Sequence, residues 1–90
     1  MRDRNGLQSA ETMALDALGF LADSPDKLER LMAQSGVDLA TVRERAGERD
    51  FLAAVLDFLM ANEDLLVDFC HATGTAPKAV HLACHKLGGA

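Results

Sequence analysis

The sequence lacks tryptophan and tyrosine, and its aromatic residues are four phenylalanines among 90 residues. β-branched side chains are few, and leucine and alanine make up most of the apolar 49%. Aromatic and β-branched residues favour strands, whereas leucine and alanine favour helices. The composition therefore predicts an all-α fold, and the length predicts a single domain.

Long apolar runs are also absent. No stretch of about 18 apolar residues occurs, which excludes a membrane span of the usual kind. Residues 1–6 lead into an amphipathic segment that carries Glu11 and Asp16, unlike the charged and then apolar order of a signal peptide. The two cysteines, Cys70 and Cys84, have no export signal before them. We therefore expect reduced thiols and a cytoplasmic protein.

Positive charge is scarce and unevenly placed. The chain has 14 acidic and 9 basic residues, for a net charge of −5. Residues 1–68 hold all 14 acids, whereas residues 69–90 hold Lys78 and Lys86 and no acid. An acidic chain repels polyanions, so nucleic acid is disfavoured as a partner. The basic segment of residues 69–90 is the one part of the sequence that could bind nucleic acid.

The sequence contains an internal similarity. Shifted by 38 residues, residues 12–46 align with residues 50–84 without a gap. Seven of the 35 pairs are identical, namely Leu18/Leu56, Phe20/Phe58, Leu21/Leu59, Asp26/Asp64, Leu28/Leu66, Gly36/Gly74 and Val42/Val80. Such a period indicates that one supersecondary unit is used twice. We expect two tandem three-helix units.

Capping residues divide the chain into six expected helices. Residues 1–8 are polar without periodicity and are predicted to form a disordered arm before a single domain over residues 9–88. Serine, aspartate and asparagine favour helix N-caps, proline the first turn, and glycine the end. The expected helices run from an N-cap at Ser9 to about Ala22, from Ser24 and Pro25 to Gly36, from Asp38 to Gly47, from an N-cap at Asp50 to Asn62, from an N-cap at Asn62 to Gly74, and from Thr75-Ala76-Pro77 to Gly88 and Gly89.

The first and fourth expected helices are apolar on nearly every side. A helix of that kind must be covered on nearly every side, so we place these two at the centre, related by a pseudo-twofold axis. Apolar residues without a second layer of cover would form an interaction surface. The candidates are Leu15, Leu52, Met60 and Leu65. A homodimer or an unidentified protein partner is the expected occupant of that surface.

Three segments resemble a known family. They are Glu11–Ala22 (ETMALDALGFLA), Ser35–Leu39 (SGVDL) and Phe51–Leu59 (FLAAVLDFL). Together they resemble a family of short bacterial helical proteins that is classified only as a domain of unknown function. The resemblance spans roughly residues 9–87 and consists of core and turn residues. It implies a helical fold and a bacterial cytoplasmic setting, and it brings no catalytic residue, cofactor or partner.

A cysteine and histidine group is the first candidate for chemistry. The possible zinc ligands are His81, Cys84 and His85 on one helix face, with Cys70 or His71 as a fourth. No paired spacing typical of zinc sites occurs. In the repeat, Cys70 and Cys84 align with Met32 and Ala46, which favours core positions for both. We therefore expect no metal and no cofactor.

Residues 62–87 have the proportions of a helix-turn-helix. Cys70 supplies the small residue before the turn at Gly74, and Val80 supplies the apolar anchor after it. The possible nucleic-acid contacts are Lys78, His81, His85 and Lys86. Any corner between two helices needs a glycine and apolar anchors, so nucleic-acid binding is the alternative function rather than the first.

Catalytic motifs are missing. The serines occupy capping or turn positions, at Ser9, Ser24 and Ser35. Paired carboxylates lie at expected helix N-termini, where the helix dipole accounts for them. No glycine-rich phosphate loop occurs. The sequence predicts that the protein is not an enzyme, and that its function is protein interaction or self-association.

Overall fold

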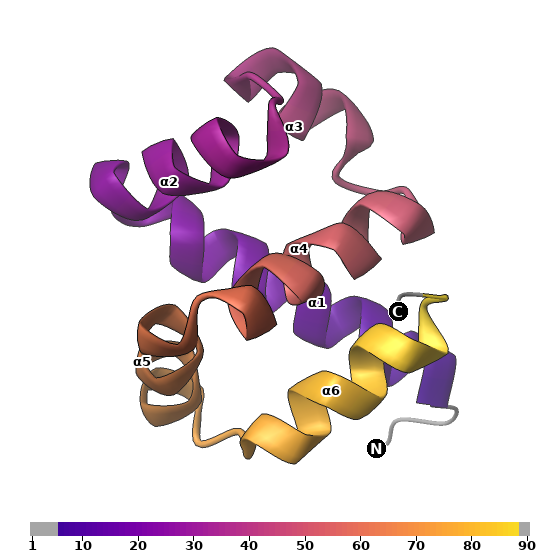
Figure 1. The fold of residues 1–90 in the computed structure, drawn as a ribbon. Helices are drawn as coiled ribbons and strands as arrows, with labels where there is room; N and C mark the ends of the chain where they lie inside the picture. The colour runs from indigo at the N-terminus through magenta and orange to yellow at the C-terminus, as the bar shows by residue number, and fades with distance from the viewer. Residues whose placement is uncertain (1–5, 89–90) are drawn as a thin grey trace.

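Residues 6–88 are described in the computed structural model, with the side chains of residues 10–88, and they form six α-helices and no strand (Figure 1). The helices are α1 (Gly6–Ala22), α2 (Pro25–Ser35), α3 (Leu39–Arg45), α4 (Arg49–Ala61), α5 (Glu63–Thr73) and α6 (Pro77–Lys86). The predicted all-α class and the number of helices are confirmed for these residues. None of the described helices is long and apolar enough to cross a membrane.

Several helix ends lie where their capping residues predicted them. Ser24 is the extended N-cap of α2, directly before Pro25. The Asp38 carboxylate caps α3 by accepting a hydrogen bond of 2.9 Å from the Thr41 N–H. Gly36 and Gly74 end α2 and α5 in the left-handed conformation, with φ of +76° and +72°. These ends follow from local residue chemistry alone.

Two predicted N-caps are wrong. α1 begins at Gly6, so Ser9 lies inside the helix, where Leu7 and Gln8 extend it as good helix formers. Residues 1–5 of the predicted arm lie outside the described residues. α4 begins after Glu48, so Asp50 lies in its first turn instead of at its cap.

A nearby arginine explains why Asp50 does not cap α4. Arg45 at the end of α3 binds Glu48 through Nε at 2.8 Å and Asp50 through Nη2 at 3.1 Å. Asn62 does occupy the N-cap of α5, but its side-chain Nδ2 donates to the Phe58 carbonyl oxygen at 2.8 Å, at the end of α4. The side chains of Asp50 and Asn62 therefore bind Arg45 and the Phe58 carbonyl oxygen, and the Asn62 side chain does not cap α5.

The core is built around α1 and α4, which pack on each other. α4 also packs against α2, α5 and α6, and seven of its residues are buried. The largest fully buried side chains of the described residues are Phe69, Leu21, Leu31, Leu52, Leu56, Leu59, Val55, Val80 and Cys84. The ring of Phe69 meets that of Phe20 edge-on, with centroids 5.5 Å apart.

The third and sixth helices pack very differently. α5 begins and ends 38 residues after α2, and α6 begins 38 residues after α3. However, α6 packs extensively on both α1 and α4, whereas α3 has no comparable contact with any other described helix. α6 buries Val80, Ala83 and Cys84, and the shorter α3 buries Val42 alone. The pseudo-twofold relation of two three-helix units therefore stays a prediction.

A polar bridge joins α2 to the start of α5. Arg30 binds Asp64 through two parallel hydrogen bonds of 3.0 and 3.1 Å. Beside them, the amides of Gln34 and Asn62 exchange hydrogen bonds of 3.1 and 3.0 Å. Hydrogen bonding by the Arg30 guanidinium holds the pKa of Asp64 below its usual value. The bridge ties the first half of the chain to the second.

Candidate interaction surfaces

The four predicted interface residues do not form one surface. Leu15 is 48% exposed, as predicted, and Met60 is half-buried. Leu52 and Leu65 are buried at 2% and 3% exposure, so the prediction is wrong for both. α4 packs against four helices, which accounts for the burial of Leu52, and α5, which carries Leu65, packs on α4 and α6.

Large apolar side chains are exposed at other places. Besides Leu15, the exposed ones are Leu39 at 42%, Val67 at 43% and Leu82 at 51%. The sequence does indicate that Leu82 is exposed, because the residue that aligns with it at the 38-residue offset is the charged Glu44. Nothing in the sequence indicates that Leu39 is exposed, because it shares a face of α3 with the buried Val42 and so has the pattern of a core residue.

An apolar groove of about 540 Å³ lies between α1, α2 and α3, and we name it the α1–α3 groove. Its lining consists of Leu15, Leu18, Gly19 and Ala22 of α1, Leu28 of α2, and Leu39, Val42, Arg43 and Ala46 around α3. Gly19 and Ala22 have little or no side chain, and a Cβ added to Gly19 would meet nothing within 4 Å. Because α3 packs only loosely on the other helices, the two exposed leucines are left along this groove.

A second groove of about 510 Å³, the α6 groove, lies where α4, α5 and α6 meet. Its lining consists of Met60, Leu66, Pro77, Lys78, His81 and Leu82. His81 Nδ1 lies 3.2 Å from Met60 Sδ. Four of these residues follow lining residues of the α1–α3 groove by 38 positions, in the pairs Ala22/Met60, Leu28/Leu66, Leu39/Pro77 and Arg43/His81.

The outer face of α6 carries the predicted nucleic-acid contacts. Its exposed residues are Pro77, Lys78, His81, Leu82, His85 and Lys86. The opposite face of the helix packs on α1 and α4. The buried Cys70 and Val80 and the left-handed Gly74 agree with the proportions of a helix-turn-helix. A half-exposed leucine lies in the middle of this face, which is typical of a protein contact and unusual for a phosphate contact.

The candidate metal ligands are not brought together. His81 and His85 are exposed, whereas Cys84 is fully buried. The Cys84 thiol donates toward the Ala53 carbonyl oxygen at 3.5 Å and lies 3.6 Å from Asp57 Oδ1. Burial, with a further contribution from Asp57, raises the pKa of Cys84 to about 11. Within residues 6–88, no group of three or more His, Cys, Asp or Glu side chains could hold a metal ion.

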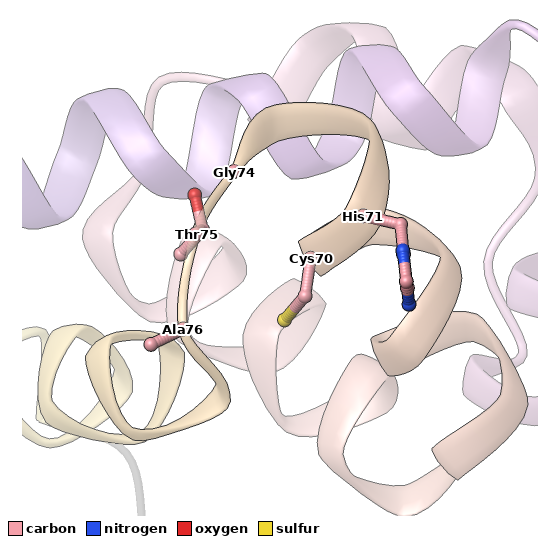
Figure 2. Close-up of a pocket in the computed structure, with 5 residues that line it drawn as sticks. All are labelled: Cys70, His71, Gly74, Thr75 and Ala76. Atoms are coloured by element: carbon pink, nitrogen blue, oxygen red, sulfur yellow. The ribbon is translucent and has the colours of Figure 1, made fainter.

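A shallow pocket of about 420 Å³ lies at the turn between α5 and α6 (Figure 2). Its lining consists of Cys70, His71, Gly74, Thr75 and Ala76. Figure 2 shows the Cys70 sulfur and the His71 ring projecting in different directions from consecutive positions of α5. Burial raises the pKa of the Cys70 thiol, so it stays protonated at neutral pH. A reactive cysteine needs the opposite shift, so this pocket lacks an activated nucleophile.

The chain matches one family model, described as "Protein of unknown function (DUF3572)", over residues 7–90. No curated protein and no solved structure matches it.

Proposed function

The chain belongs to the DUF3572 family, and because that family is described only as a protein of unknown function, we propose a function from the surface itself: a small protein-interaction module. Membership confirms the resemblance to a domain of unknown function and assigns no activity. The proposed binding surface is the α1–α3 groove, and the proposed ligand is an apolar segment of another protein chain.

One observation carries this proposal, namely the two half-exposed leucines at the α1–α3 groove. Leu15 and Leu39 are 48% and 42% exposed beside an apolar trough of about 540 Å³. Burying a whole leucine side chain is favourable by about 1.5–3 kcal/mol. Covering the exposed half of both leucines therefore contributes about 2 kcal/mol to the binding free energy, before other contacts are counted. An amphipathic helix laid into a groove is a common way to gain that energy.

A protein segment suits this groove better than a small molecule does. Sites for small molecules enclose the ligand and present several convergent polar groups. The lining here is apolar apart from Arg43, and its leucines are open to solvent. The groove therefore offers area and shape, which are what a helix face uses, and few hydrogen-bonding groups that would orient a metabolite.

We propose further that residues 12–46 and 50–84 are tandem copies of one three-helix unit, related by an approximate twofold axis. The equal offset of α2 and α5 supports this, as do the four pairs of lining residues shared by the two grooves. In this interpretation both grooves descend from one ancestral groove. The looser packing of α3 leaves the first copy more open.

We also propose that the protein is cytoplasmic and has no enzymatic activity. Cys70 and Cys84 are buried free thiols, as expected in a reducing compartment. The raised pKa values of both thiols disfavour a nucleophilic role.

Nucleic-acid binding by residues 62–87 is the alternative, favoured by the exposure of Lys78, His81, His85 and Lys86. The net charge of −5 and the exposed Leu82 count against it. Gel shifts at low salt with mixed-sequence DNA and RNA decide the matter, since non-specific binding is strongest there. No shift at high protein concentration ends this alternative.

The experiment for the interaction module is site-specific crosslinking. A photoreactive benzophenone amino acid replaces Leu39 at the groove, and in the control it replaces Asp68, an exposed residue of α5. In intact cells we expect a discrete protein adduct from position 39 and none from position 68. Adding Leu15→Ser to the same chain should remove the adduct. Equal labelling from both positions, or an adduct that Leu15→Ser leaves unchanged, refutes the groove as the binding surface.

A further inference from the structure

The α1–α3 groove has a complementary surface on the same chain. Resting on the function proposed above, we propose that the groove binds the outer face of α6 from a second copy, so that chains associate head to tail. The partner of the module is then the module itself.

Charge complementarity is the first reason. α1 carries Glu11 and Asp16 and no basic residue, whereas α6 carries Lys78 and Lys86 and no acidic residue. Opposite signs on two helices favour their encounter and fix their relative placement.

The charges are placed around the exposed leucines. On α6, Lys78 and Lys86 lie four residues before and after Leu82, which is about 6 Å along the helix on the same side. On α1, Glu11 lies four residues before Leu15, and Asp16 follows it. Each leucine therefore has ionic neighbours of one sign, and the signs of the two helices are opposite.

The composition of each surface supports the same pairing. Leu82 is the most exposed large apolar side chain of the described residues, at 51%, and it stands out from a helix whose other face is packed. The groove has an open floor at Gly19 that can take such a side chain. Arg43 is the basic member of the groove lining; it is exposed, and its long side chain can extend past an incoming helix into solvent.

Placement in the fold makes the contact head to tail. In Figure 1, α2 and α3 lie on one side of the α1 and α4 pair, and α5 and α6 lie on the other. A groove on one side cannot meet α6 of its own chain, and groove-to-groove pairing would set the acidic α1 against itself. Contacts between two different surfaces of one chain form rings or open chains. The assembly therefore grows with concentration, and added salt weakens it because its charges are solvent-exposed.

Two charge variants test the pairing by sedimentation velocity. Leu39→Lys blocks the groove with a charge that repels α6, and Leu82→Glu blocks the outer face of α6 with a charge that repels α1. Each variant alone should be a monomer at concentrations where the wild-type chain associates, with a dissociation constant weakened about tenfold or more. Mixed at equal concentration, they should form a 1:1 dimer and nothing larger, because one intact groove and one intact α6 face remain.

Val67→Ser is the matched control, because Val67 is 43% exposed but lines neither groove, and this variant should associate like the wild type. Circular dichroism checks the fold, and Leu39→Ser and Leu82→Ser replace any charge variant that loses its helical signal. A Leu82→Glu chain that associates normally, a mixture that stays monomeric, or a wild-type chain that is monomeric at all concentrations overturns the head-to-tail pairing. If the wild type is monomeric but position 39 still crosslinks a different protein, only this inference fails. If it crosslinks nothing, the proposed function fails with it.

Discussion

Replacing glycine by alanine at three positions should change the stability of the fold in two opposite directions. Gly19 lies in the interior of α1, and a Cβ there meets nothing within 4 Å. Alanine is more favourable than glycine inside a helix by about 0.8–1.0 kcal/mol, because it loses less backbone entropy on folding. Gly19→Ala should therefore raise the free energy of unfolding by about 1 kcal/mol.

Gly36 and Gly74 should respond with the opposite sign. An added Cβ meets nothing within 4 Å at either position, so no clash contributes. Their φ values of +76° and +72° are left-handed, which costs an L-residue about 1–2 kcal/mol. Alanine also restricts the unfolded chain, which returns about 0.4–1 kcal/mol. Gly36→Ala and Gly74→Ala should each lower the free energy of unfolding by up to about 1.6 kcal/mol net. Valine, with its branched side chain, should lower it further.

The measurement is urea unfolding followed by far-ultraviolet circular dichroism, because the chain has no tryptophan or tyrosine for fluorescence. Gly19→Ala and Gly36→Ala should differ by about 2 kcal/mol, which corresponds to about 10 °C or more in Tm for a domain of this size. Stabilisation by all three substitutions would refute the assignment of Gly36 and Gly74 to helix ends. Destabilisation by Gly19→Ala would refute the open floor of the α1–α3 groove.

Phe69→Ala should lower the free energy of unfolding by about 3–5 kcal/mol, because the ring is fully buried, and a loss below about 1 kcal/mol in urea titrations would contradict its core position. The folded chain should resist alkylation by iodoacetamide at Cys84, since burial raises that pKa to about 11 and leaves little thiolate. Alkylation of Cys84 as fast in buffer as in urea, measured by mass spectrometry, would argue against its burial. Because the raised pKa stabilises the fold only while the Cys84 thiol is neutral, the free energy of unfolding should fall as pH rises from about 9 toward 11. Asp64 has a lowered pKa, so its contribution is present above the ordinary aspartate value of 3.8 and is lost as pH falls below it. Arg30→Gln should reduce this acid sensitivity in pH titrations followed by circular dichroism, and an unchanged acid midpoint would count against the ion pair.

Local signals in the sequence predicted the helix pattern well. The ends of α2 and α5 follow from Ser24, Pro25 and the two left-handed glycines, and each depends on neighbours within a few residues. Serine is also tolerated inside a helix, which is why the predicted N-cap at Ser9 is wrong. Such errors arise where a single residue has two compatible positions.

The candidate surface could be predicted only in part. Leu15 is exposed as the sequence predicts, whereas Leu52 and Leu65 are buried. Leu39 was missed because its exposure comes from the loose packing of α3, a property of the tertiary structure that helical periodicity does not encode. Which apolar face stays open depends on how distant helices meet, and one sequence carries little information on that.

The packing of α6 on α1 bears on how the protein folds in the cell. α1 is synthesised first of the six helices and α6 last, yet they pack extensively on each other. Until Val80, Ala83 and Cys84 have left the ribosome, α6 cannot cover the surfaces of α1 and α4 on which it packs. Closure of the core therefore depends on nearly the whole domain being made, and a chain truncated before Pro77 should remain a substrate for proteases and chaperones.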